Sequence, residues 1–243
     1  MTTTDTTFDF STCTVADLAL SFPKAIGILN KNNLDYCCHG KTGFVAACES
    51  ADLNPHKVWQ EILEANLKQG PENRMQFEAW EPSLLMDFIT QHHHTYVRES
   101  IPQIQELLNK VCDVHGNDRP YLLTVRETFN ELANELLNHL PKEELILFPA
   151  IRKILDSDSA SGTREFVQTP LHVMEDEHDR AGDLIKTLRG LTGNYSAPVD
   201  ACPTFQFTYK LLKEFDEDLI QHIHLENNIL FPKVKLETLT TFF

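Results

Sequence analysis

A histidine followed four residues later by a glutamate occurs twice in this chain, and this repeated motif limits the fold more than any other feature. The first copy is His139 and Glu143, and the second, 83 residues later, is His222 and Glu226. Each copy is followed by the same tetrapeptide, Ile-Leu-Phe-Pro, at 146–149 and at 229–232. In an α-helix this spacing places the two side chains one turn apart on one face. The motif therefore predicts two equivalent helices, each presenting an imidazole and a carboxylate on the same side.

These four residues stand where the helical pattern requires apolar side chains. The apolar stripe before the first copy is Leu122, Val125, Phe129, Leu132 and Leu136, and the stripe before the second copy is Leu212, Phe215 and Leu219. In both helices the next two positions of the stripe are the histidine and the glutamate. A carboxylate turned into a helix core is costly unless it is paired or binds a metal. Two such carboxylates, each beside an imidazole, indicate a metal site inside a helix bundle.

Charge and composition exclude several classes of partner. The 243 residues carry a net charge of -15 with a pI near 5.1, which argues against nucleic acid and anionic membranes as partners. No apolar run approaches the ~20 residues of a transmembrane helix, and the N-terminal residues lack the basic and apolar regions of a signal peptide. The six cysteines are scattered apart from one adjacent pair, unlike a secreted disulfide framework. We therefore expect a protein of the reducing cytoplasm with free thiols.

Residues 1–72 are expected to form a small helical module that carries the adjacent cysteines. We expect Thr14 to cap a first short helix and Pro23 to open a second. Two further short helices are expected after Gly43 and after Asn54, with a turn at residues 34–40 between the second and third helices. A stretch rich in Gly, Pro and Asn near residue 70 is typical of a linker.

Residues 80–243 are predicted to form an all-α, up-down four-helix bundle. The expected helices run from about Pro82 to His115, from near Pro120 to Leu155, from about Thr169 to Leu191 and from about Pro203 to Lys235. Strand signals are nearly absent, and four long amphipathic helices favour a bundle. Pro141 removes a backbone donor between the histidine and glutamate of the first motif, so we expect a kink there.

The other two helices should complete the ligand set, because two His-Glu pairs cannot fill a site alone. His178 occupies a core position of the third helix. In the first helix the heptad pattern extends back to His94, although His93 is only slightly off the same face, and periodicity alone separates them weakly. His94 and His178 are 84 residues apart, close to the spacing of the motifs, which indicates a duplicated helical hairpin. Four imidazoles and two carboxylates suit a pair of iron atoms; the competing interpretation is a set of core histidines held by hydrogen bonds.

At this point the chain resembles the iron–sulfur cluster repair di-iron proteins, also called the repair of iron centres family, over nearly its whole length. These join a hemerythrin-like bundle to a short N-terminal Cys-Cys module. The specific matches are Asp-Tyr-Cys-Cys at 35–38, Glu-Asp-Glu-His-Asp at 175–179, and the stretch 222–232, His-x3-Glu-Asn-Asn-Ile-Leu-Phe-Pro. In the family pattern the first ligand precedes a proline by eight residues, which selects His94 before Pro102.

The resemblance implies a fold, a cofactor and a role. It implies iron ligands at His94, His139, Glu143, His178, His222 and Glu226, with both glutamates bridging. Two iron ions with an oxo or hydroxo bridge would follow from this set. The implied role is the repair of iron–sulfur proteins damaged by nitric oxide or peroxide, with damaged iron–sulfur proteins as partners.

The adjacent cysteines, Cys37 and Cys38, are expected to act as a thiol pair that accepts iron or sulfur species or forms a reversible disulfide. The competing interpretation is two small buried hydrophobes. His39 stands where the family has the first glycine of Cys-Cys-Gly-Gly. If that position needs a positive φ, histidine is strained there; if His39 is protonated, it lowers the pKa of a neighbouring thiol. The other four cysteines are interpreted as structural.

Several other polar residues receive weaker interpretations. His92 and His93 are expected to face solvent or to support a ligand, and His224 is expected to be exposed because it points away from His222. Glu135 and Glu177 lie either near the metals or on a solvated face. The acidic run at 214–218 is most simply a solvated face.

Three functions remain open on the sequence alone. The leading one is repair of iron–sulfur clusters by iron donation or redox chemistry at the di-iron centre. A second is reduction or scavenging of nitric oxide at the same site, and a third is a non-enzymatic oxygen or iron sensor. Nitric oxide or oxygen would be the small ligand, and the N-terminal module could also mediate a homodimer.

Overall fold

The computed structural model describes residues 8–22, 24–67, 75–155 and 161–239, and within these ranges every regular element is a helix. The chain divides into two compact units, Met1–Ala79 and Trp80–Phe243. None of the helices in the described ranges is long and apolar enough to cross a membrane.

The first unit contains four short α-helices and a 3-10 turn: α1 (Val15–Ser21), α2 (Ala25–Lys31), α3 (Phe44–Ser50), α4 (Pro55–Leu67) and η1 (Phe77–Ala79). The predicted cap of α1 is confirmed. The Asp17 backbone N–H donates to Thr14 Oγ1 at 3.1 Å, and Asp17 Oδ2 accepts from the Thr14 N–H at 2.9 Å, which completes a capping box. Pro23, the expected start of the second helix, lies outside the described residues.

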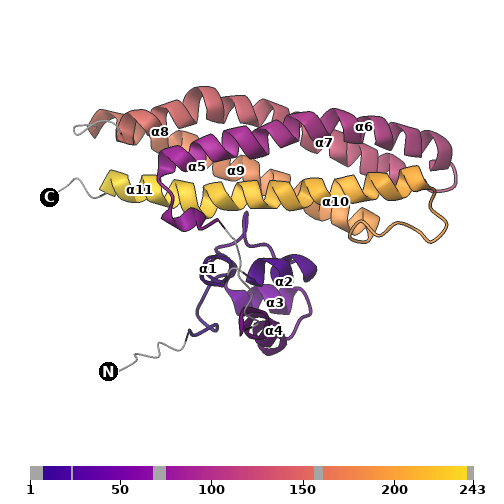
Figure 1. Ribbon diagram of the computed structural model, residues 1–243, viewed down its shortest axis with the longest axis horizontal. Coiled ribbons are helices and arrows are strands. Elements are labelled where there is room, and N and C mark those ends of the chain that lie inside the picture. The colour runs from indigo at the N-terminus through magenta and orange to yellow at the C-terminus, as the bar shows by residue number, and fades with distance from the viewer. Residues whose placement is uncertain (1–7, 23, 68–74, 156–160, 240–243) are drawn as a thin grey trace. The chain divides into compact units, whose positions relative to one another are not determined.

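The second unit is the predicted up-down four-helix bundle, which Figure 1 shows as four long rods lying side by side. Its first rod consists of α5 (Pro82–Phe88), η2 (Ile89–His94) and α6 (Thr95–His115). The second consists of α7 (Tyr121–Lys142), η3 (Glu143–Leu147) and α8 (Phe148–Leu155). The third is α9 (Ser161–Thr192), and the fourth consists of α10 (Pro203–His224), η4 (Leu225–Leu230) and α11 (Phe231–Leu239). The third helix begins at Ser161 rather than near Thr169.

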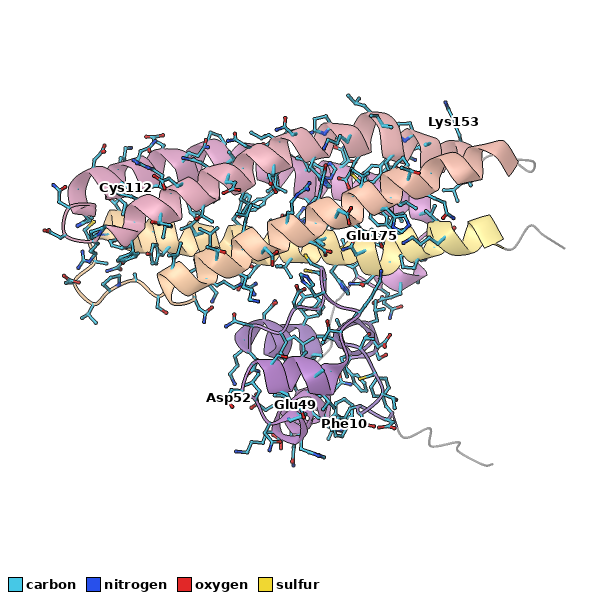
Figure 2. All side chains as sticks on the ribbon, turned by 180° about the vertical axis from the view of Figure 1, so that it is seen from behind. Phe10, Glu49, Asp52, Cys112, Lys153 and Glu175 are labelled. Carbon is cyan, nitrogen blue, oxygen red and sulfur yellow. The ribbon has the colours of Figure 1, made fainter. Side chains whose placement is uncertain are left out.

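The predicted apolar stripes form the core of this bundle. Val97, Ile101, Ile104, Leu108, Leu122, Phe129, Leu132, Leu212, Phe215 and Leu219 are all buried. Figure 2 shows Cys112 and Lys153 at opposite ends of the bundle, with side chains filling the space between the helices. At the Cys112 end, His115 Nε2 lies 3.4 Å from Cys202 Sγ, a contact that the sequence did not indicate.

The bundle helices become π-helical where the ligand motifs lie. Segment η2 ends at His94, η3 begins at Glu143, and η4 contains Glu226. The kink expected at Pro141 stays a prediction; α7 continues through the proline to Lys142 and passes directly into η3. The second motif has His224 at the equivalent position and also passes into a π-helix, so the proline is not what requires the wider turn. π-Helical turns are frequent at functional sites.

The interpretation of residues 214–218 as a solvated face is wrong for Asp216. Its side chain is buried and receives two hydrogen bonds from the Arg189 guanidinium, from Nε at 2.6 Å and from Nη2 at 2.5 Å. Glu214 and Glu217, on the same helix, are exposed as expected, whereas Asp218 is only partly exposed and its Oδ1 lies 2.9 Å from His93 Nδ1, so the interpretation is wrong there as well. A partner 27 residues away on another helix leaves no trace in the local pattern, and this bidentate ion pair joins α9 to α10.

Removing the buried carboxylate should therefore destabilise the bundle strongly. We expect Asp216→Ala to lower the free energy of unfolding by about 3 kcal/mol, because a largely buried guanidinium loses its partner. Glu217→Ala, on the exposed face of the same helix, is the matched control and should change it by less than about 0.5 kcal/mol. Urea unfolding at constant m-value measures both; equal losses would contradict a role for the Arg189 pair.

Candidate metal centre

The fold brings together all six residues that the sequence predicted as ligands. His94, His139, Glu143, His178, His222 and Glu226 come from all four rods of the bundle, and each is at most 3% exposed. They fall into two groups that share both glutamates: one holds His94 and His222, the other His139 and His178.

The carboxylate oxygens divide between the two groups in a regular way. Glu143 Oε2 lies 3.3 Å from His94 Nε2, while Glu143 Oε1 lies 3.2 Å from His139 Nε2. Glu226 Oε1 lies 3.2 Å from His222 Nε2, while Glu226 Oε2 lies 3.1 Å from His178 Nε2. Each glutamate thus presents one oxygen to each pair of imidazoles, which is the arrangement of two carboxylates that bridge two cations.

The spacing and the unsatisfied oxygens both fit metal ions. The two imidazole nitrogens within each group are 3.2 Å apart (His94, His222) and 3.1 Å apart (His139, His178). Ligands bound at ~2.1 Å to one ion, at angles between right and tetrahedral, lie about 3.0–3.4 Å apart. All four oxygens of Glu143 and Glu226 are buried, and none has a well-aligned hydrogen bond to a described residue. Donors that crowd together without bonding one another are what a shared cation would satisfy.

Charge balance at the centre is set by these close contacts. Burial favours a neutral carboxyl, yet His139 and His94 hold the pKa of Glu143 well below its usual range. Burial opposes a charged imidazole, yet Glu143, Glu177 and Glu226 raise the pKa of His139 to about 10. For His222 burial prevails, and its pKa is lowered. A cation bound to neutral imidazoles would take over the compensation of both carboxylates and displace the protons.

Three of the four imidazoles are oriented by a hydrogen bond at Nδ1. His139 Nδ1 donates to Glu177 Oε2 at 2.8 Å, which confirms the interpretation that placed Glu177 near the site. His94 Nδ1 donates to Glu144 Oε1 at 2.7 Å, and His178 Nδ1 to Asn227 Oδ1 at 2.8 Å. These contacts direct each Nε2 lone pair toward the centre. Sequence reasoning missed Glu144 and Asn227, although each directly follows a motif glutamate and they are 83 residues apart, as the motifs are.

Comparison with known proteins agrees with this geometry. Residues 86–234 match the hemerythrin HHE cation binding domain, and residues 11–66 match a domain of unknown function, DUF542 (ScdA_N). The iron-sulfur cluster repair proteins YtfE of Shigella boydii and Citrobacter koseri are each 34% identical over 222 residues, which is 90% of this chain and 94% of theirs. A Haemophilus influenzae protein named "Probable iron-sulfur cluster repair protein" is 33% identical over 90% of this chain and 95% of its own length.

The chain belongs to this iron–sulfur cluster repair family. Its bundle is a hemerythrin-type cation-binding domain, and the buried histidine and glutamate groups lie within the matched range. The family resemblance drawn from the sequence is thereby confirmed, as is the helical fold with a small N-terminal domain.

The structure decides between the two alternatives left open for His93, in favour of a residue that supports a candidate ligand, and it corrects the prediction for His224. His93 is fully buried, with its ring stacked parallel to that of His222 at a centroid distance of 5.5 Å. His224 is only 4% exposed, and its Nδ1 lies 2.9 Å from Asn228 Nδ2. The prediction for His224 assumed that one face of the helix meets solvent and that each residue turns the helix by 100°. Residues 222–226 are instead all buried, and the helix changes to π-type directly after His224. His92 is exposed, as expected.

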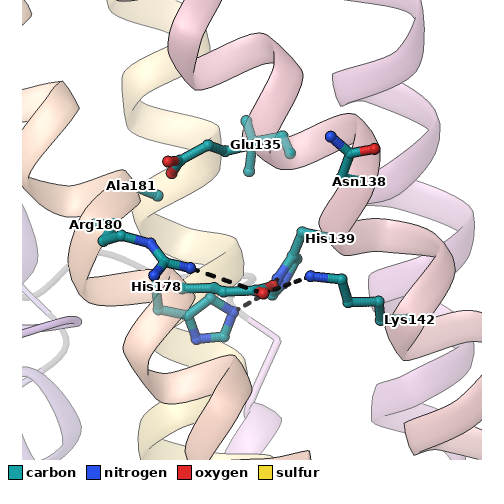
Figure 3. A pocket seen from close by; sticks show the side chains of 9 residues that line it. Glu135, Asn138, His139, Lys142, His178, Arg180 and Ala181 are labelled. Carbon is teal, nitrogen blue, oxygen red and sulfur yellow. Dashed lines mark hydrogen bonds and ion pairs between the residues drawn. The ribbon is translucent and has the colours of Figure 1, made fainter.

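A cavity of about 150 Å³ opens beside the His139 and His178 pair. Figure 3 shows His139 and His178 on facing helices, with Lys142 and Arg180 close to them and Glu135 further along the opening. Lys142 and Arg180 both approach the carboxylate of Glu177, and Glu135 Oε2 is buried with no hydrogen-bond partner in the described ranges. Positively and negatively charged side chains therefore line a cavity beside one half of the centre.

The cysteine pair lies in a tight turn organised by Asp35. Asp35 Oδ1 accepts hydrogen bonds from the backbone N–H groups of Cys37 and Cys38, both at 3.0 Å, and the two sulfurs are 3.4 Å apart. Cys37 is buried and Cys38 is partly exposed. His39 Nδ1 lies 3.0 Å from Asp35 Oδ2.

Activation of Cys37 by His39 is not what the structure supports. Burial, then Cys38 and Asp35, raise the pKa of the Cys37 thiol well above its usual value. The strain considered for His39 is also absent, because its φ is not positive. The following Gly40 is the restricted position, since a Cβ there would lie 2.4 Å from the Tyr36 carbonyl oxygen.

The outer hydrogen bonds should control metal affinity. We expect Glu144→Ala to weaken metal binding about 10–100-fold, because His94 loses the acceptor that fixes its ring. Glu131→Ala, an exposed glutamate of α7, is the matched control and should bind as the unchanged protein does. Competition with a chelator of known affinity measures both. Equal affinities for the two variants would show that the Glu144 contact does not position His94.

Proposed function

We propose that this protein repairs damaged iron–sulfur clusters by means of two iron ions held by His94, His139, Glu143, His178, His222 and Glu226. The observation that carries the proposal is the division of the four glutamate oxygens between two pairs of imidazoles. The curated relatives named as iron–sulfur cluster repair proteins support the same role.

The donor set favours iron over the alternatives. Imidazole binds iron, zinc, copper and nickel, whereas carboxylates that bridge two cations favour harder ions. Structural zinc sites are closed, four-coordinate and usually rich in cysteine. Here no cysteine of the described chain belongs to either group, and each group offers four donors, which leaves further positions on an ion that prefers six.

The protein's own residues would hold the iron ions and control which molecules reach them. Iron in this donor set would supply reversible electron transfer and binding of small diatomic molecules. The apolar bundle restricts water, while the cavity beside His139 and His178 admits a small molecule such as nitric oxide or oxygen. Glu177 joins His139 to Lys142, and these two contacts lower its pKa to about 2, so its carboxylate stays charged and accepts from His139 Nδ1.

The cysteine pair would take part as an acceptor of iron or sulfur species rather than as an activated nucleophile. Cys38 is the partly exposed member, and its sulfur lies 3.4 Å from that of the buried Cys37. Closing these adjacent cysteines to a disulfide on oxidation would be strained, because their Cα atoms are ~3.8 Å apart across a trans peptide, less than the ~4.4–6.8 Å of relaxed disulfides. Damaged iron–sulfur proteins of a reducing cytoplasm would be the clients.

Metal content is the first test of this function. Protein purified without added metal should contain about two irons per chain, and the Glu143→Ala, Glu226→Ala double variant should retain almost none, because both bridging ligands are gone. Elemental analysis and the paramagnetic spectrum on partial reduction measure this. Zinc alone, or no metal after anaerobic ferrous reconstitution, would remove the basis for the proposal.

Repair itself is tested on a nitric-oxide-damaged iron–sulfur enzyme in lysate. The unchanged protein should restore activity and the double glutamate variant should not. Cys37→Ser, Cys38→Ser should keep its iron and lose most of the repair, which separates the thiols from the centre. Full repair by the glutamate variant would mean that the centre is not the agent.

The cavity favours one second candidate, reduction of nitric oxide at the same centre. A small cavity beside the His139 and His178 half suits a small neutral substrate. Nitrous oxide formed under turnover identifies this activity, whereas reversible oxygen binding with neither repair nor nitrous oxide identifies a sensor.

A further inference from the structure

Three consecutive histidines, His92, His93 and His94, stand in η2, and the centre uses only the last of them. His93 Nδ1 lies 2.9 Å from Asp218 Oδ1, and His93 is fully buried. His93 does not belong to either group of four, so the proposed centre does not account for this buried pair.

We propose that His92, His93 and Asp218 form a third, separate binding site for a divalent transition-metal ion. Donor atoms of these three residues all lie within 4.8 Å of one another. The 2.9 Å between His93 Nδ1 and Asp218 Oδ1 matches the ~3.0 Å edge between two ligands that meet at a right angle on an ion with bonds of ~2.1 Å. Two imidazoles and one carboxylate with open positions are the donor set that suits ferrous iron.

The π-helical turn explains why adjacent histidines can serve one site. In an α-helix neighbouring side chains diverge by about 100°. The wider turn of a π-helix reduces this angle to about 80°. Segment Ile89–His94 is π-helical, and the His92 and His93 ring centroids are 4.9 Å apart. Asp218 approaches from α10, one turn before His222.

Unsatisfied groups at the site call for a ligand. His93 Nε2 and Asp218 Oδ2 are both buried without a hydrogen-bond partner in the part of the chain that the structure describes. Leaving such groups without partners costs about 1–3 kcal/mol each. A cation at the Asp218 carboxylate would supply the interaction that its Oδ2 lacks.

Charge and exposure suit a cation that exchanges with solvent. Glu214 and Glu217 lie on the exposed face of the same helix. Burial raises the pKa of the Tyr96 hydroxyl, and the charges of Asp218, Glu214 and Glu217 raise it further. Arg189 neutralises Asp216, but the negative charges of Glu214, Glu217 and Asp218 remain and favour cations. His92 is exposed, while Phe88 stacks on its ring at 5.0 Å and 23°. The site therefore has one accessible ligand and two sheltered ones.

The position of the site gives it a function in metal transfer. The His93 ring lies parallel to the ring of His222, with centroids 5.5 Å apart and 5° between the planes. A cation held by His92, His93 and Asp218 is thus one imidazole layer from the proposed di-iron centre. This role, holding an ion on its way to or from the centre, rests on the proposed function, whereas the binding of the ion does not.

Anaerobic titration of the full-length Cys37→Ser, Cys38→Ser protein with ferrous iron or cobalt(II), followed by elemental analysis and calorimetry, tests the site without uptake of an ion by these thiols. We expect about three ions per chain at saturation, the third bound more weakly because it has only three protein ligands. His92→Ala and Asp218→Asn should each lose the third ion and keep the other two. His172→Ala, an exposed histidine of α9, should keep all three.

A second set of variants separates this proposal from the di-iron centre. In the same Cys-to-Ser background, Glu143→Ala, Glu226→Ala should still bind one ion, and adding His92→Ala should abolish it. Saturation of the background protein at two ions, or a third ion that survives both His92→Ala and Asp218→Asn, would overturn the site. Filling of the centre should be slower in His92→Ala, and an unchanged filling rate would overturn the transfer role.

Discussion

The burial of two carboxylates between four helices is the constraint on which the bundle depends. Glu143 and Glu226 are fully buried, and desolvation of each costs several kcal/mol unless positive charge is close. Four imidazoles surround them, and a metal pair would complete the compensation. The Cys112 end of the bundle is packed with Leu, Ile and Phe, so apolar burial there offsets the cost of the polar end. Stability and site are thus divided along the length of the same helices.

The π-helical segments answer a geometric demand of the centre. Glu143 must face the two imidazole pairs, while the next residue, Glu144, must reach His94 on the neighbouring rod. Glu226 and Asn227 meet the same demand on the other side. Two consecutive side chains can both point inward more easily when the turn is wider than an α-helical one. Segment α9 contributes only His178 to the centre and contains no π-helical segment.

The six candidate ligands could be named from the sequence because the core pattern and the repeat pointed to the same positions, and the family pattern selected His94 over His93. None of these signals reaches residues whose role depends on a partner from another rod. Asp216 meets Arg189, and His93 meets Asp218, 125 residues away. A protonated His39 was considered as a group that lowers the pKa of a nearby thiol, but burial, which the local sequence does not reveal, raises the pKa of Cys37. The assumption that a helix has one exposed and one buried face also fails to predict burial where the helix is enclosed on every side, as at His224.

The two halves of the duplicated centre have become different, and the difference lies in what stands behind the ligands. His139 and His178 are backed by Glu177 and Asn227 and adjoin the cavity. On the other half, His94 is backed by Glu144, but His222 Nδ1 is buried without a hydrogen-bond partner among the described residues, and the His93 ring covers it. Because a hydrogen bond at Nδ1 strengthens an imidazole ligand, His222 would be the weakest donor of the four to a bound metal. One half of the site therefore adjoins the cavity, and the half without this hydrogen bond lies against His93.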